Sequence, residues 1–349
     1  MRRIYVGMED GLAVLTRSGD GAATPWRLET RLEGRQAQCV AVDPSHPASV
    51  YCGTFDAGLW RSEDGGETWH PAGPGIAHQA VMAVAVSPLE RNGLGVVYAG
   101  TEPSALFRSD DGGQTWQERA ALRHLPSAPT WSFPPRPYTH HVRWIQPDPV
   151  VAGRLFVAIE QGGVMRSLDG GETFEDRKPG GPRDAHTLAM HRQAPGRLYA
   201  PAADGMGLPE RAMTTSRDGG ASWDGDGAGI GHGYGWSVAI APGQPEHVVY
   251  SGAHSPRQAH SLEGAESTLY YRHGDGDTWH QALDGLPPPR GTLRYVLAAD
   301  AADAGAVYAA CNHGVYRSPN GGRTWEALDV PWPERYRRQA VQGLAVVSA

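Results

Sequence analysis

The sequence predicts an all-β protein that forms one seven-bladed β-propeller with four antiparallel strands per blade, and three observations support this fold class. A short acidic phrase, first written RSEDGGETW at 61–69, returns in strong or weakened form about every 50 residues. Short apolar runs separated by turn residues accompany each copy. The 46 Gly and 28 Pro are spread between these runs, which is typical of a turn-rich protein. Because seven such units account for the whole chain, we expect a single domain over residues 1–349.

Each unit begins with an apolar run that we assign to the innermost strand of a blade. Examples that end in proline are CVAVDP at 39–44, AVAVSP at 83–88, VRWIQP at 142–147 and SVAIAP at 237–242. A second apolar run follows, the third strand ends in the acidic phrase, and the fourth strand begins at the Trp of that phrase.

The two ends of the chain predict how the ring closes. The N-terminal run IYVG at 4–7 reads as a second strand, and QGLAVVSA at 342–349 reads as a lone first strand. We therefore expect the C-terminal strand to pair with the N-terminal blade, so that residues 1–30 and 340–349 share the first blade.

Charge and cysteine content exclude several classes of protein. The formal net charge of −7 argues against a broad nucleic-acid or anionic-membrane footprint. No run of 18 apolar residues occurs, so no membrane span is expected. The three cysteines form no CxxC pair, and no apolar leader follows the N-terminus, so we expect a cytoplasmic protein. We also expect a monomer.

The acidic phrase has two interpretations, a metal loop or a turn. Ser62 and Asp64 can hydrogen-bond backbone N–H groups of a tight turn, Gly66 permits a positive φ, and Trp69 anchors the next strand. No unit supplies the full ligand set of a calcium loop, so we favour the turn. The strong copies have their aspartates at Asp64, Asp111, Asp169 and Asp218, and the weakened copies are centred on Asp20, Gly274 and Asn320.

The S-x-D-x-G-x-T-W pattern resembles the Asp-box, or BNR repeat, of sialidases, sortilin-type receptors, xyloglucanases and photosystem II assembly-factor propellers. The resemblance covers the whole chain and implies a propeller with the Asp-box turns on the face away from the usual binding site. Sialidases have six blades and an F/Y-R-I-P sequence, which is missing from this chain, so their activity does not carry over.

The other ends of the strands therefore become the place to look for a site. Polar residues gather there in the fourth to seventh units, and we expect a catalytic group of Glu160, Asp184, His186 and Tyr295. Imidazoles and a carboxylate from adjacent strand ends suit a divalent metal, Zn or Mn, for which the candidate ligands are His140, His141, Glu160, His186 and His254. The expected substrate-binding residues are Gln38, Trp131, Tyr138, Tyr234, Trp236 and Arg294. The alternative is that these polar residues only solvate a wet channel.

Three long segments, 123–141, 203–213 and 254–267, are expected to cover the same side. Together these features favour a metal-dependent or His/carboxylate-dependent hydrolase or lyase that binds a small-molecule or oligosaccharide-like ligand, without nucleic-acid or membrane partners. The alternative is a non-enzymatic binding or assembly propeller.

Overall fold

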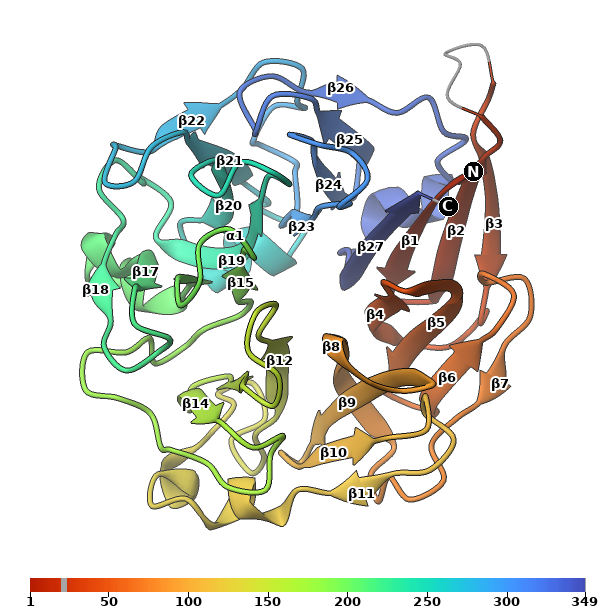
Figure 1. Ribbon diagram of the computed structural model, residues 1–349. Coiled ribbons are helices and arrows are strands. Elements are labelled where there is room, and N and C mark those ends of the chain that lie inside the picture. Colours follow the sequence, from red (N-terminus) through yellow and green to blue (C-terminus); the bar gives the residue numbers. More distant parts are fainter. Residues whose placement is uncertain (20–23, 349) are drawn as a thin grey trace.

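In the computed structural model, which describes residues 1–19 and 24–348, seven antiparallel sheets are arranged in a ring about a common axis (Figure 1). The weakened repeat centred on Asp20 lies outside the described residues. The fold class predicted from the sequence is confirmed.

The first three blades in chain order are made as follows. Blade one holds β27 (Gly343–Ser348), β1 (Arg2–Met8), β2 (Gly11–Arg17) and β3 (Arg27–Arg31). Blade two holds β4 (Ala37–Asp43), β5 (His46–Thr54), β6 (Gly58–Ser62) and β7 (His70–Pro71). Blade three holds β8 (Ala80–Asn92), β9 (Leu94–Glu102), β10 (Leu106–Ser109) and β11 (Gln117–Glu118).

The remaining four blades complete the ring. Blade four holds β12 (Val142–Pro147), β13 (Leu155–Ile159) and β14 (Gly163–Ser167). Blade five holds β15 (Ala189–Met190), β16 (Leu198–Pro201), β17 (Met213–Ser216) and β18 (Asp224–Gly225). Blade six holds β19 (Tyr234–Ile240), β20 (Val248–Ala253), β21 (Ser267–Arg272) and β22 (His280–Ala282). Blade seven holds β23 (Val296–Ala298), β24 (Val307–Cys311), β25 (Gly314–Ser318) and β26 (Glu326–Ala327).

Helices occur only as short pieces in the loops of the described chain. They are the 3-10 helices η1 (Ala120–His124), η2 (Ala128–Thr130), η3 (Ala203–Met206), η4 (Pro209–Arg211) and η5 (Glu334–Arg338), and the α-helix α1 (Pro256–His260). No described helix has the length and apolar character needed to cross a membrane.

Blade four departs from the expected four strands. Its sheet has three strands, and the place of the fourth is taken by a single antiparallel bridge between Arg166 and Glu175. Arg166 also donates to the carboxylate of Glu175 at 2.7 Å, so a side-chain contact reinforces this one backbone bridge.

The ring closes as predicted, by antiparallel pairing of β27 with β1. Ile4 pairs with Val346 and Val6 with Leu344, and the two termini lie side by side (Figure 1). Ile4, Val6 and Leu344 are buried in a cluster that also contains residues of blades six and seven. The last strand therefore supplies both backbone pairing and apolar packing to the seam.

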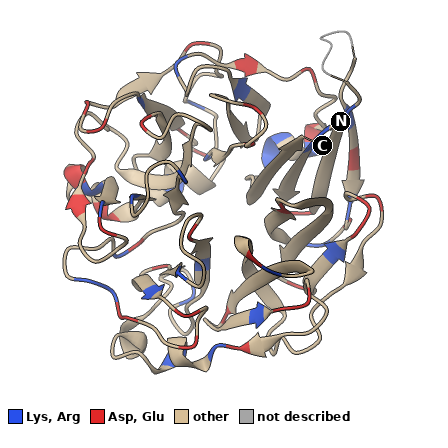
Figure 2. Ribbon diagram, viewed as in Figure 1, with Lys and Arg blue, Asp and Glu red and all other residues tan. Residues whose placement is uncertain are grey.

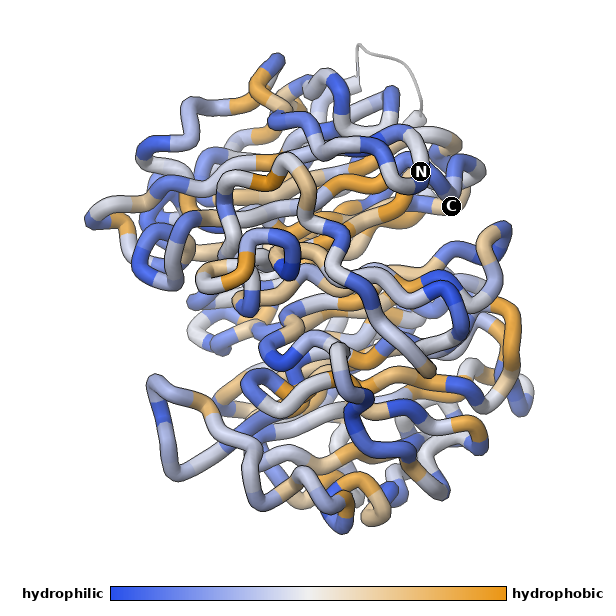
Figure 3. Tube along the Cα trace, turned by 90° about the vertical axis from the view of Figure 1, so that its left-hand side faces the viewer, coloured by the Kyte–Doolittle hydropathy of each residue, from blue (hydrophilic) through white to orange (hydrophobic). Residues whose placement is uncertain are grey.

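Hydrophobic residues follow the strands, whereas hydrophilic residues dominate the connecting loops (Figure 3).

Tyrosines of one blade also reach the Asp-rich turn of the next blade. The Tyr5 hydroxyl donates to the Gly65 carbonyl, and the Tyr51 hydroxyl donates to the Gly112 carbonyl, both at 2.8 Å. Acidic and basic residues are interspersed around the ring (Figure 2).

The acidic phrase forms a closed turn, as the sequence indicated. The Asp64 carboxylate accepts hydrogen bonds from the Ser62 hydroxyl at 2.7 Å, the Thr68 N–H at 2.9 Å and the Thr68 hydroxyl at 2.6 Å. Gly66 has a φ of 96°, which strongly favours glycine. These turns therefore use their carboxylates internally.

Strand register puts these turns and the candidate site at opposite ends of a blade. In blade four, Leu155 at the start of β13 pairs with Ser167 of the Asp-rich turn, whereas Ile159 at its end pairs with Gly163. Glu160 follows Ile159 directly. The expected separation of turn face and site face is therefore present in the structure.

Candidate functional site

A pocket of about 740 Å³ opens at the strand ends that lie opposite the Asp-rich turns. It is lined by residues from all seven blades and their loops: Glu9, Gln38, Met82, Phe133, Pro134, Pro135, Arg136, His141, Arg143, Glu160, Gln161, Asp184, Met206, Tyr234, Trp236, Pro256, Arg257, His260, Arg294 and Gln342. This mixture of aromatic groups and convergent charged groups is typical of a small-molecule site.

β-bulges in the innermost strands direct side chains into this pocket. Four first strands show a register shift that skips one residue, and the skipped residues are Gln38, Met82, Arg143 and Trp236. All four line the pocket. A bulge leaves one residue out of the ladder and re-aims its side chain, so the backbone irregularity itself builds part of the site.

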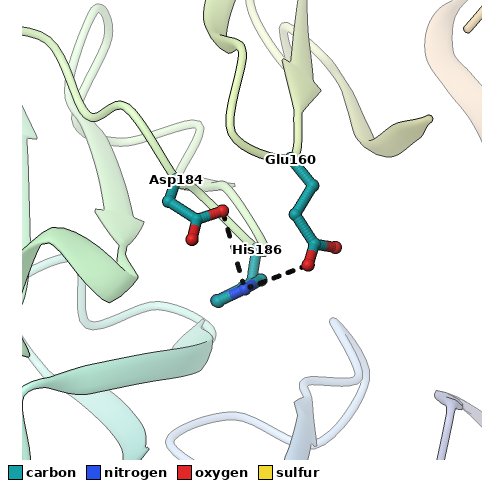
Figure 4. A group of neighbouring side chains, drawn as sticks. All are labelled: Glu160, Asp184 and His186. Carbon is teal, nitrogen blue, oxygen red and sulfur yellow. Dashed lines mark ion pairs between the residues drawn. The ribbon is translucent and has the colours of Figure 1, made fainter. Parts of the chain in front are cut away.

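Glu160 and Asp184, which line the pocket, converge with the buried His186 (Figure 4). Their ligand atoms all lie within 4.8 Å of one another. His186 Nε2 is 3.9 Å from Glu160 Oε1 and 3.9 Å from Asp184 Oδ1. Three side chains that could bind a cation or share a proton therefore meet at one point.

A backbone carbonyl fixes the orientation of the His186 ring. Its Nδ1 lies 2.5 Å from the carbonyl oxygen of Gly235. Because a carbonyl can only accept, Nδ1 carries a proton, and Nε2 is the nitrogen that faces the two carboxylates. His186 is fully buried, so this orientation is also enforced by packing.

Asp184 is held by the residue that follows Glu160. The backbone N–H of Gln161 donates to Asp184 Oδ1 at 3.0 Å, and its side-chain amide donates to Oδ2 at 2.8 Å. Gln161 has a φ of 54°, a conformation rare for a residue with a side chain. Burial and the charge of Glu160 raise the pKa of Asp184. The two carboxyl groups are therefore shifted in opposite directions, because the pKa of Glu160 is lowered.

His141 lies between two carboxylates. Its Nε2 is 2.9 Å from Glu160 and its Nδ1 is 3.3 Å from Glu102. Burial alone would lower the pKa of His141, but the two carboxylates outweigh it and raise the pKa. The His141 imidazolium, with His186 and Arg143, in turn holds the pKa of Glu160 well below its usual range despite burial. Glu160 is therefore a stable carboxylate.

A directional chain of hydrogen bonds crosses the pocket floor. Arg294 Nη1 lies 2.7 Å from His260 Nδ1, and because a guanidinium only donates, this nitrogen is an acceptor. Neutral His260 then donates from Nε2 to the Tyr234 hydroxyl oxygen at 2.9 Å. The Tyr234 hydroxyl hydrogen is left to face His186 Nε2 at 3.5 Å. Burial and the Arg294 charge lower the pKa of His260 and so favour its neutral form.

Two guanidinium groups pack against one indole ring. The Cζ atoms of Arg143 and Arg294 lie 4.6 Å and 4.4 Å from the ring centre of Trp236. Both arginines are buried, with 8 % and 4 % of their surface exposed. Cation–π contact compensates in part for the loss of water around the two charges.

The long segments reach the pocket, as expected. Segment 123–141 contributes Phe133 and Arg136, segment 203–213 contributes Met206, and segment 254–267 contributes His260 on α1. Arg136 donates to the Glu102 carboxylate at 2.8 Å and 2.6 Å, so its charge is neutralised within the protein.

Eight of the predicted site residues come together in this pocket or at its wall. They are Gln38, His141, Glu160, Asp184, His186, Tyr234, Trp236 and Arg294.

Five predicted site residues lie elsewhere. Tyr295 packs in the core with Leu297 and Cys311, because the side chain of Arg294, one residue earlier, takes the pocket position. Trp131 packs in the core of blades three and four, and His140 contacts it edge-on outside the pocket. Tyr138 is 85 % exposed. His254 stacks on His232 with ring centres 3.9 Å apart.

Sequence reasoning missed Arg143 and His260 as site residues. The run VRWIQPDP contains two prolines. Aligning Pro147 with Pro44 of blade two made His141 the counterpart of Gln38, whereas the bulges show that Arg143 is the counterpart of Gln38. Matching Pro149 instead would have found Arg143. His260 lay within a segment already singled out as a long loop, but only the short helix α1 brings its ring to Tyr234.

Comparison with known proteins agrees with the fold and the repeat. The BNR/Asp-box repeat family matches residues 60–71 and 107–118, which are two of the acidic turns described above. The protein is a seven-bladed propeller with Asp-box repeats. No curated protein sequence matches the chain.

Several solved structures have a similar fold. A GH74 enzyme of Niastella koreensis has a TM-score of 0.67 at 16% identity, over 93% of this chain and 52% of that chain. An ancestral GH74 enzyme has a TM-score of 0.63 at 18% identity, over 84% and 38%. YCF48 bound to a D1 peptide has a TM-score of 0.56 at 16% identity, over 84% and 81%. The chain thus spans about half or less of the GH74 structures, and at these identities the likeness shows the fold alone.

Proposed function

We propose that this Asp-box propeller is a hydrolase or lyase that acts on a small polar or saccharide-like substrate in the central pocket, with a divalent cation held by Glu160, Asp184 and His186. The observation that carries the proposal is that the ligand atoms of these three side chains lie within 4.8 Å of one another, and that two of the three residues, Glu160 and Asp184, line the pocket. One imidazole and two carboxylates are a donor set that suits Zn or Mn.

Two details of the donors support the fit. The hydrogen bond from Nδ1 to the Gly235 carbonyl leaves Nε2 as the nitrogen of His186 that can bind a cation, which is the usual arrangement of a metal-bound histidine. Glu160 Oε1 has no hydrogen-bond partner among the described residues, whereas Oε2 is held by His141. A cation bound there would polarise a substrate oxygen or lower the pKa of a bound water.

The chain's own residues supply orientation and proton transfer. The His141 imidazolium fixes Glu160, and Gln161 fixes Asp184. Tyr234 keeps its proton, because burial and the nearby carboxylates raise its pKa well above the usual value. Its hydroxyl lies 3.5 Å from His186 Nε2, so it can donate a hydrogen bond or proton to a substrate oxygen bound beside that atom.

Metal content tests this proposal. Protein purified without a His tag and equilibrated with MnCl₂ or ZnCl₂ should hold about one ion per chain by plasma mass spectrometry. His186→Ala and Glu160→Gln should lose the ion. His254→Ala is the matched control, because His254 stacks on His232 away from the three ligands and should leave the stoichiometry unchanged.

The competing hypothesis is a non-enzymatic binding or assembly propeller. It predicts no stoichiometric metal, and no metal-dependent turnover of 4-nitrophenyl glycosides by either the wild-type protein or Glu160→Gln. Wild-type protein that binds neither ion would contradict the proposed metal site.

A further inference from the structure

The pocket contains a positive charge that the protein itself does not neutralise. Arg143 makes no hydrogen bond to any described residue, and the nearest carboxylate contact of its guanidinium is 3.9 Å from Nε to Glu160. Its side chain is only 10% exposed, and it lines the pocket. Apart from its cation–π contact with Trp236, this buried guanidinium has exchanged its water for no close hydrogen-bond partner.

Arg294 is in a related position in blade seven. Its Nη1 and Nη2 donate at 2.7 Å to His260 and to the side-chain oxygen of Gln342, which are both uncharged groups, and its Nε has no hydrogen-bond partner. Burial and the charge of Arg143 lower the pKa of Arg294 to about 10. The two cations therefore reinforce each other's positive potential.

The other pocket arginines differ from this pair. Arg136 is engaged by both carboxylate oxygens of Glu102, and Arg257 is a rim residue with 70% of its side chain exposed, 3.4 Å from Glu263. Only Arg143 and Arg294, among the described arginines that line the pocket, are both buried and stacked on Trp236.

We infer that Arg143 and Arg294 form a carboxylate-binding subsite beside Trp236, so that the substrate of this propeller is a carboxylate-bearing polar molecule such as a sugar acid. The inference rests on the proposed function for the reaction itself, but the subsite is independent of the metal. A planar carboxylate can take hydrogen bonds from guanidinium nitrogens while the rest of the molecule packs on the indole ring.

The charges around the subsite favour a singly charged anion. Glu9, Glu160 and Asp184 also line the pocket, and they would repel a phosphate dianion more strongly than a carboxylate. Glu160 Oε2 is 3.9 Å from Arg143 Nε, so Glu160 and Asp184 would lie beside the bound substrate, where they can face the part that reacts.

Titration calorimetry with three probes tests the subsite. Wild-type protein in EDTA should bind D-glucuronate at least about tenfold more tightly than D-glucose, which has a hydroxymethyl group in place of the carboxylate, because a hydrogen bond to a charged group is stronger than one to a neutral group. Inorganic phosphate should bind more weakly than D-glucuronate. Equal binding of the two sugars, no binding of either, or tighter binding of phosphate would overturn the inference.

Variants then locate the effect. Arg143→Gln should abolish the preference for D-glucuronate, and Arg143→Lys should retain part of it. Arg192→Gln, at an exposed position that does not line the pocket, should stay within about twofold of wild type. Thermal unfolding of each variant shows that it is folded. A folded Arg143→Gln that keeps the full preference would overturn the assignment.

Metal content of the same protein preparations, equilibrated with MnCl₂ instead of EDTA, separates the two proposals. If the protein binds manganese but does not prefer D-glucuronate, the subsite is wrong and the metal site stands. If it prefers D-glucuronate in EDTA but never binds metal, the subsite stands and the proposed metal site is wrong.

Discussion

The Nδ1 atom of His186 donates to the carbonyl oxygen of Gly235, so a ring that belongs to blade five is oriented by the backbone of blade six. The carbonyl belongs to the residue next to the bulged Trp236. One backbone irregularity therefore aims Trp236 into the pocket and also orients the His186 ring.

This contact predicts opposite tautomers for two neighbouring histidines. In metal-free protein, neutral His186 should be the Nδ1–H tautomer, and neutral His260 should be the Nε2–H tautomer because Arg294 occupies its Nδ1. ¹⁵N chemical shifts of selectively labelled histidine measure this directly. The same tautomer at both positions would contradict the hydrogen-bond chain across the pocket floor.

Removal of the imidazolium between two carboxylates should be costly. His141→Gln leaves Glu102 and Glu160 facing each other in a largely buried setting, and we expect a loss of about 3–5 kcal/mol in the free energy of unfolding. Urea unfolding measures this loss. His70→Gln, at an exposed position, should change stability by less than about 0.5 kcal/mol. A loss below about 1 kcal/mol for His141→Gln would show that the positive charge of His141 is not needed to hold the two carboxylates in the folded protein.

The Asp-box turns should make the free energy of unfolding depend on pH in the acidic range. Hydrogen bonds from Thr115 and Ser109 outweigh burial and lower the pKa of Asp111 to about 2, below the value of about 3.9 expected in the unfolded chain. A carboxyl group whose pKa is lower in the folded than in the unfolded state stabilises the fold at pH values above its unfolded-state pKa. This contribution disappears as the pH falls toward 2.

Asp111→Asn should therefore be less stable than wild type at pH 7 and nearly equal to it near pH 2, as measured by urea unfolding at each pH. Asn320 already takes this position in blade seven, where its side-chain oxygen accepts from the Thr324 N–H at 3.0 Å, so the variant turn can form. Asp329→Asn, at an exposed position, is the control and should show no such convergence. A constant difference across this pH range would refute the prediction.

Ring closure should depend on the last strand. A chain that ends at residue 339 loses the pairing of β27 with β1, and we expect it to be insoluble or rapidly degraded in limited proteolysis. Leu344→Ala keeps the strand and removes one buried side chain, so it should fold with a loss of about 2–3 kcal/mol. Unchanged thermal unfolding of the truncated chain would contradict this role.

The sequence was sufficient for the fold because the repeat is periodic and its turn chemistry is local. Ser62, Asp64 and Thr68 lie within one turn, so their spacing alone indicates their contacts. The site was harder to predict, because its residues come from separate blades. Tyr295 and Arg294 differ by one position, and only the strand conformation decides which of the two faces the pocket. Trp131 was recognised as a loop aromatic, but no local pattern shows that it packs inward.

The hydrogen bond between Arg294 and Gln342 has a mechanical consequence. Gln342 immediately precedes the strand that seals the ring, so tension applied to the C-terminus pulls on a side chain that holds the pocket floor. A substrate that bridges Arg143 and Arg294 would connect blade four to blade seven across two intervening blades. This connection would resist opening of the seam between β27 and β1. Occupancy of the pocket and resistance to pulling should therefore rise and fall together.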